Sequence, residues 1–258
     1  MNFCSLHIFT LILALAAFTV PLQAQAADKP SVGIELFNKG DYAGAVQTLK
    51  GSKNYVELSY LGLAYEKLGK TKEAGKALDD SFERTFWLIT NVLAQKPKIF
   101  GKHQDAPKGT AGERLNALKE PIAFAVATAA KATALKSGDS KNDLFKKRVE
   151  LLAGLRSVLE RGETIYAEAD VTTKLNFTHK PIPRYTDEAR RNLIQGTVVL
   201  LALFKQDGTL IYVPLNTIQG GLMPGIYDAA NAIKFTPAMM DGKPVTVLDT
   251  LEHRFEIF

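Results

Sequence analysis

Residues 196–215, GTVVLLALFKQDGTLIYVPL, decide the fold of the C-terminal part of the chain. Two runs rich in β-branched and aromatic residues flank Asp207-Gly208, a dipeptide that favours a tight turn between paired strands. Residues 198–204 are all apolar, which predicts a strand that is buried on both faces. Pro214 has no amide hydrogen for a central ladder, so the second strand is expected at an edge or a bulge.

The last residues of the chain, 245–258, predict one more strand. Apolar and polar residues alternate along it, as in an antiparallel strand with one face on the core and the other in water. The core-facing residues are Val245, Val247, Leu251, Phe255 and Ile257, and the polar residues are Thr246, Thr250, Glu252, Arg254 and Glu256. If an edge of this strand is exposed, its backbone offers unpaired amides and carbonyls to a partner.

Two helices are expected beside these strands. Residues 187–194 follow Thr186, a good N-cap, and begin with two acidic residues, as the helix dipole prefers. Residues 222–234 carry apolar side chains at helical spacing. The order helix, two strands, helix, strand predicts an α+β unit over residues 173–258, with a three-stranded antiparallel sheet and two helices.

The segment before the last strand, 234–247 (KFTPAMMDGKPVTV), is interpreted as structural rather than chemical. Phe235 is expected to cap the core where the second helix ends, and Pro237 is expected to stop that helix. Asp241-Gly242 should turn the chain, and Pro244 should stiffen it before the strand begins.

Residues 180–258 resemble the C-terminal domain of the TonB family. The resemblance rests on an ordered set of residues at compatible spacing, in which each piece alone is a weak signal. The set is Pro183, Tyr185, Ala189, Arg190, Gly196, Thr197, Val198, Asp207, Gly208, Gly220, Asp228, Ala229, Ala230, Phe235, Pro237, Ala238, Asp241, Gly242, Lys243, Pro244, Val245 and Phe255.

This resemblance implies a periplasmic module that binds outer-membrane TonB-dependent receptors. A short peptide of the receptor would add as a strand beside the last strand of the module. The residues of that strand assigned to the partner contact are Val245, Val247, Asp249, Leu251, His253 and Phe255. The alternative is an edge that is covered within the chain or by a second copy, as in a homodimer.

The N-terminal half contains a repeat. Gly33 and Gly62, Gly40 and Gly69, Ala45 and Ala74, and Leu49 and Leu78 are separated by one constant offset of 29 residues. Residues 31–82 therefore resemble two tetratricopeptide repeats, with a shorter period than that family's 34 residues and without its closing proline. Further helices are expected to complete an all-helical domain over 27–172, which is either a scaffold for protein contacts or packs only against its own chain.

The first residues resemble a secretory signal. An apolar run over 8–20 precedes Pro21 and the small-residue site Ala24-Gln25-Ala26, which predicts a signal peptide at 1–26 and a periplasmic protein of a Gram-negative-type bacterium. No Lys or Arg precedes the run, so an uncleaved anchor in the inner membrane is the alternative, although 13 residues are short for a span. Cys4, the only cysteine, lies before the run, so the mature protein would have no thiol.

Several classes of function are disfavoured. The composition, with 46% hydrophobic and 23% charged residues, is that of an ordinary globular protein. None of the four histidines (His7, His103, His179 and His253) lies beside a nucleophile or at a metal-ligand spacing, so neither an enzyme nor a metal or other cofactor is expected. A net charge of +5 without a concentrated basic stripe argues against nucleic-acid binding.

The leading hypothesis is an exported adaptor that docks a protein of the envelope by β-strand addition. One alternative is a membrane-anchored energy transducer of the TonB type. The resemblance implies that such a transducer has an N-terminal membrane helix followed by a long proline-rich spacer. In this chain a helical domain stands in place of the spacer. The other alternative is a structural cell-wall adaptor that holds glycan or another protein through its helical domain.

Overall fold

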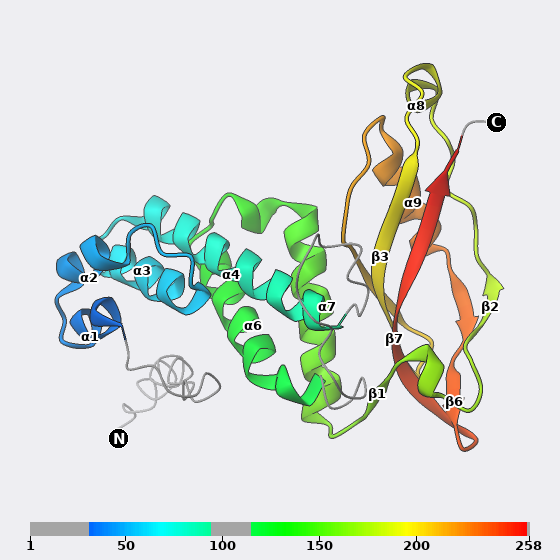
Figure 1. Ribbon diagram of the computed structural model, residues 1–258, viewed down its shortest axis with the longest axis horizontal. Helices are drawn as coiled ribbons and strands as arrows, with labels where there is room; N and C mark the ends of the chain where they lie inside the picture. Colours follow the sequence, from blue (N-terminus) through cyan, green and yellow to red (C-terminus); the bar gives the residue numbers. More distant parts are fainter. Residues whose placement is uncertain (1–30, 94–114, 257–258) are drawn as a thin grey trace, which may run out of the picture.

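The computed structural model describes residues 31–93 and 115–256. Helices fill the N-terminal half and a mixed sheet follows, so the predicted α+β class is confirmed (Figure 1). Within these residues no helix is both long and apolar enough to cross a membrane. The predicted signal peptide and Ile257 lie outside the described residues.

The repeat corresponds to two helix pairs. α1 (Val32–Asn38) packs on α2 (Tyr42–Leu49), and α3 (Tyr55–Lys67) packs on α4 (Thr71–Leu93). Within each pair the glycine of the first helix lies against the leucine of the second. A Cβ on Gly33 would lie 2.3 Å from Leu49, and one on Gly62 would lie 2.7 Å from Leu78. The repeated residues thus mark points of close helix contact.

Two longer helices extend this stack. α6 (Lys119–Ala134) packs on α4, and α7 (Asp143–Glu160) packs on α6 after a short 3₁₀ turn, η2 (Asp139–Lys141). The side chain of Asn142 caps α7 by accepting a hydrogen bond from the amide of Leu144 at 2.9 Å. Phe82 and Phe145 join α4 to α7 with their ring centroids 4.7 Å apart.

The described part of the chain contains a five-stranded sheet in which four strands lie in the order β1-β7-β3-β4, and β6 also pairs with β7. These strands are β1 (Ile165–Tyr166), β3 (Gly196–Phe204), β4 (Leu210–Pro214), β6 (Ala238–Met240) and β7 (Lys243–Phe255). Three of these strands, β7, β3 and β4, form the three-stranded antiparallel sheet that the sequence predicts. The prediction is incomplete, because the sequence pattern did not indicate β6 or the parallel strand β1. A second sheet joins β2 (Asn176–His179) to β5 (Lys234–Thr236).

Strand β3 separates two cores. Every residue from Val198 to Phe204 is buried, as predicted. Val199, Leu201 and Leu203 share a core with α4, α6 and α7, whereas Val198, Leu200 and Phe204 share one with α9 (Leu222–Asn231). The helical half therefore covers one face of the sheet, and Thr246 on β7, expected on a wet face, is only 2% exposed.

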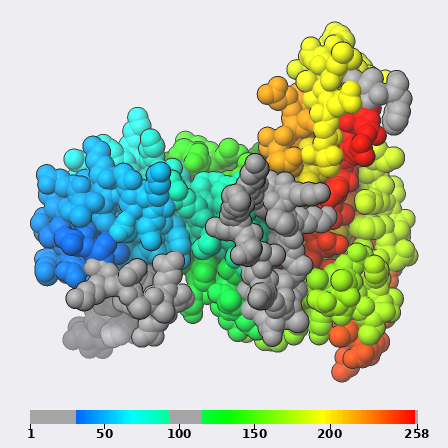
Figure 2. Space-filling view, viewed as in Figure 1, coloured from blue at the N-terminus to red at the C-terminus, as the bar shows by residue number. Residues whose placement is uncertain are grey.

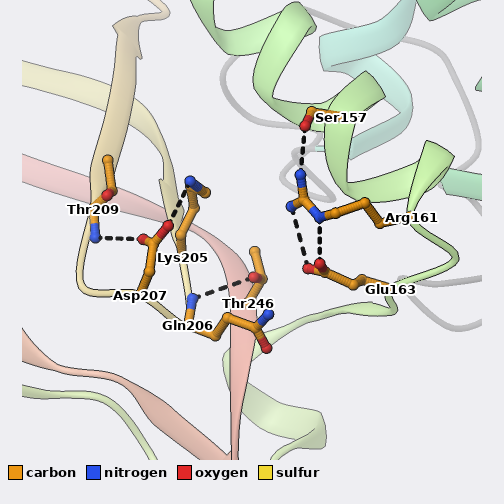
Figure 3. Close-up of polar contacts among 8 residues, drawn as sticks. All are labelled: Ser157, Arg161, Glu163, Lys205, Gln206, Asp207, Thr209 and Thr246. Carbon is orange, nitrogen blue, oxygen red and sulfur yellow. Dashed lines mark hydrogen bonds and ion pairs between the residues drawn. The ribbon is translucent and has the colours of Figure 1, made fainter.

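The β3–β4 turn and the end of α7 lie close together (Figure 3). Asp207 accepts hydrogen bonds from Lys205 Nζ at 2.7 Å and from the amide of Thr209 at 2.9 Å, and these contacts lower its pKa to about 2. Beside it, Arg161 at the C-terminus of α7 pairs with Glu163. Pro214 lies on β4, which is the edge strand, as expected.

The segment before β7 corrects one prediction. α9 ends at Asn231, so Pro237 does not stop it; this proline lies between β5 and β6 instead. Residues 234–236 are extended because they pair with β2, and the ring of Phe235 packs on that of Phe204 at 5.1 Å. Asp241-Gly242, with φ of 50° and 77°, turns the chain from β6 into β7, as predicted.

Candidate functional site

The outer edge of β7 is the candidate site. On one side β7 pairs with β3 from Val247 to Phe255. On the opposite side β1 pairs only with Thr246 and Val247. From residue 249 onward, the described part of the chain places no second strand beside β7, and Figure 1 shows it continuing past β1 between β3 and the chain that leads from β2 to α8 (Asp187–Arg191).

The register determines which backbone groups face outward. The carbonyl of Val199 accepts from the amide of Leu215, and the amide of Lys205 donates to Thr209, so odd-numbered residues of β3 face β4. Even-numbered residues of β3 therefore face β7, where Val198 lies opposite His253. Odd-numbered residues of β7 thus direct their amides at β3, and even-numbered ones direct theirs outward.

This register moves the expected partner contact away from most of the residues that the sequence analysis assigned to it. Four of the six residues assigned to the partner have buried side chains: Val247, Leu251, His253 and Phe255. Val245 pairs with Ala238 of β6. The side chains of these five residues are thus held by the core or by neighbouring strands, and an added strand would meet the even-numbered positions instead.

The sixth residue, Asp249, protects part of the edge. Its Oδ1 accepts a hydrogen bond from the amide of Thr250 at 2.7 Å. Thr250 and Glu252 also take part in other interactions. The part of the edge best suited to a partner is therefore the last one, around Arg254, whose side chain is 73% exposed and forms an ion pair with Glu256.

A proline-rich segment forms a second wall beside this last part of β7. Residues 180–183 and 252–255 together line a pocket of about 220 Å³. Pro183 is buried, whereas Ile182 between the two prolines is 91% exposed. Figure 2 shows atoms of β7 (red) at the surface, bordered by the yellow-green atoms of the preceding segment.

Three residues in or just before α8 hold this wall in place. The ring of Tyr185 packs against that of Phe255 with centroids 5.6 Å apart, and its hydroxyl donates to the carbonyl of Ile194. Arg190 lies over the same tyrosine ring at 5.6 Å. Thr186 caps α8 through the amide of Ala189. The wall is therefore fixed at its C-terminal end.

Other residues singled out in the sequence analysis shape strand ends and turns. Gly196 begins β3 with φ of 155°, and a Cβ there would lie 3.2 Å from Ile218. Gly208 turns β3 into β4 with φ of 84°. Pro244 lies near the start of β7, opposite Met239. None of these residues lines the pocket beside β7.

His253 is a buried polar group inside the pocket. Its side chain is 7% exposed, and its Nε2 has no hydrogen-bond partner in the described residues. Burial lowers the pKa of His253, and the positive charge of Lys180 lowers it further. Both effects favour the neutral form of the imidazole.

Lys180 and the wall were not assigned a role from the sequence. The two prolines of residues 179–185 (HKPIPRY) disfavour a helix and stiffen the chain, but their position beside β7 depends on tertiary contacts. Lys180 Nζ lies 4.8 Å from the centroid of the Phe177 ring. No ion pair of Lys180 occurs within the described ranges, so its charge is available to the pocket.

No group of three or more His, Cys, Asp and Glu side chains in the part of the chain that the structure describes could hold a metal ion. Asp79, which the sequence places beside Asp80, is buried and accepts a hydrogen bond from Ser137 Oγ at 2.8 Å. This carboxylate joins α4 to the end of α6 rather than lining a pocket.

Comparison of the sequence with models of protein families and with curated proteins finds no match.

Proposed function

We propose that this protein is an exported adaptor that captures an extended segment of an envelope protein along the last part of β7. The observation that supports the proposal is the edge of β7 beyond residue 249, which has no second strand in the described residues. An added strand there would form backbone hydrogen bonds with β7, and pockets beside the edge would select its side chains.

The geometry restricts where capture would begin. Asp249 already occupies the amide of Thr250, so pairing would start near Arg254 and extend back only by displacing that carboxylate. A short contact of this kind limits unwanted pairing between edges, which exposed strands otherwise promote. Thr250 and Glu252 each already take part in another interaction, so pairing begins at Arg254 rather than at these two residues.

The resemblance to the TonB family supports a periplasmic location and, as the partner, an outer-membrane receptor. The helical half, with its resemblance to tetratricopeptide repeats, would serve as a scaffold fixed to one face of the sheet. A membrane-anchored transducer is the alternative. Sequencing the N-terminus of the purified mature protein separates the two, because cleavage after Ala26 removes the apolar run.

The capture proposal is tested with two substitutions at one position. Peptides of about seven residues are selected from a random display library, and binding is followed by NMR on the full mature chain. Arg254→Pro removes the outward amide without breaking the ladder to β3, so it should abolish binding. Arg254→Ala keeps the amide and should bind within about threefold of wild type, as expected for an exposed side chain.

Thermal unfolding of both variants establishes that they fold. Selected peptides should shift the NMR signals of residues 252–255 first. Binding that is unchanged in Arg254→Pro, or signals that shift only on the helical half, would rule out capture at this edge.

A further inference from the structure

We propose that the pocket between residues 180–183 and β7 recognises a carboxylate on the captured segment, with Lys180 and His253 as the binding groups. This inference rests on the proposed function and adds the chemistry of the ligand. It follows from two independent features of the pocket: an unpaired buried nitrogen and an unneutralised cation.

The first feature is His253 Nε2. A buried polar atom without a partner is destabilising, so such atoms are rare unless a ligand or water completes them. This nitrogen belongs to a side chain on a long, well-paired strand, opposite Val198 of β3. The strand fixes the ring in place, and the pocket that His253 lines provides room for a ligand group.

The second feature is Lys180. Its charge is close enough to His253 to lower the pKa of that imidazole. No carboxylate pairs with Lys180 in the described residues, where the nearby acid Glu256 is paired with Arg254 instead. Glu252 also lines the pocket and takes part in an interaction of its own. Lys180 is therefore the one charged lysine or arginine of the lining that no ion pair holds in the described residues.

A carboxylate satisfies both features at once. It has only acceptor atoms, and it can receive hydrogen bonds from the lysine ammonium and from an imidazole N–H together. A cationic side chain would be repelled by Lys180, and an apolar one would leave Nε2 unpaired. The pocket of about 220 Å³ is large enough for a group of several atoms.

The carboxylate could come from a Glu or Asp side chain or from the end of a chain. The test uses peptides of alternating Thr and Val on the full mature protein, with Glu or Gln at the centre and both ends blocked. A third peptide carries Gln and a free C-terminus. We expect the Glu peptide to bind about tenfold more tightly than the blocked Gln peptide, as for a charge-assisted contact.

Two substitutions assign the preference to the pocket. Lys180→Gln should reduce the preference for the Glu peptide over the blocked Gln peptide to less than about twofold. His253→Gln should also weaken this preference, because it should lower the affinity for the Glu peptide more than the affinity for the blocked Gln peptide. Lys174→Gln is the matched control, because Lys174 is an exposed cation on the same stretch of chain that does not line the pocket. It should keep the wild-type preference.

The outcomes separate this inference from the proposed function. Equal binding of all three peptides at residues 252–255 overturns carboxylate recognition and leaves strand capture standing. No binding by any peptide of this series or from the library overturns both. Tighter binding by the Gln peptide with a free C-terminus than by its blocked form supports the carboxylate and identifies the chain end as its source.

Discussion

At the scale of single residues, the most unusual acid of the helical half is Asp79. Burial raises its pKa to about 6, and the charges of Asp139 and Asp80 also raise it, against the hydrogen bond from Ser137. The folded state therefore binds a proton more tightly than the unfolded state does. Stability contributed by the protonated form is present below pH 4 and is lost as the pH rises through about 6.

The substitution Asp79→Asn tests whether stability falls as the pH rises because of this group. The wild-type protein should lose up to about 3 kcal/mol of unfolding free energy between pH 4 and pH 7 through this group, and the variant should not. The difference in unfolding free energy, variant minus wild type, should therefore increase with pH. Urea unfolding at several pH values measures it. Glu73→Gln is the control and should show no such trend, because Glu73 is exposed on the same helix and is not among the groups that shift the pKa of Asp79.

A second residue-scale prediction concerns the close contact between α3 and α4. A methyl group on Gly62 would lie 2.7 Å from Leu78 Cγ and 3.1 Å from the carbonyl of Ala74. Gly62→Ala should therefore destabilise the protein by about 1–3 kcal/mol, despite the better helix propensity of alanine. Gly138→Ala is the control, since nothing lies within 4 Å of its Cβ position. Equal melting temperatures of the two variants would contradict this account of the repeat.

At the scale of elements, the sequence predicted those features that depend only on neighbouring residues. The buried strand β3, the edge position of Pro214 and the turn at Asp241-Gly242 all follow from a few neighbouring residues. β1 did not follow, because its two residues become a strand only by pairing with Thr246 and Val247, far along the chain. The same reason explains β2, β5 and β6.

The candidate site was likewise predicted only where it depends on neighbouring residues. Alternation along β7 correctly predicted that Val247, Leu251 and Phe255 are buried, but it wrongly placed Thr246 on a wet face. It also predicted the edge as a surface for a partner. It could not give the direction of the backbone groups, which depends on the register of Val198 opposite His253. The wall at residues 180–183 also depends on the packing of Tyr185 on Phe255.

Hydrogen exchange of backbone amides tests whether the outer edge of β7 is exposed. The amide of Arg254 faces outward with no strand beside it in the described residues, whereas those of Leu251 and His253 face β3. We expect the amide of Arg254 to exchange at least about tenfold faster than those of Leu251 and His253, because the latter require opening of the ladder. Hydrogen exchange followed by NMR measures all three. Equal protection would show that the edge is covered.

At the scale of the whole molecule, the helices and the sheet share one core. Val199, Leu201 and Leu203 pack with residues of α4, α6 and α7, and Lys147 on α7 lies 4.1 Å from the ring centroid of Tyr212 on β4. Separating the halves would expose these side chains, at about 1.5–3 kcal/mol for each large apolar residue. The proposed boundary between 172 and 173 thus crosses a continuous core, and it leaves β1 of the sheet in the segment that was predicted to be all-helical.

This shared core predicts that the two halves unfold together. Trp87, the only tryptophan, lies on α4 and reports on the helical half through its fluorescence. The amides of Leu200 and Leu251 report on the sheet by NMR. In urea the two signals should give one midpoint and one slope, because loss of either half uncovers the core of the other. A sheet that keeps its amide signals at urea concentrations where Trp87 is already exposed would show that the recognition edge is carried by an independent domain, and that the helices serve only as an attachment.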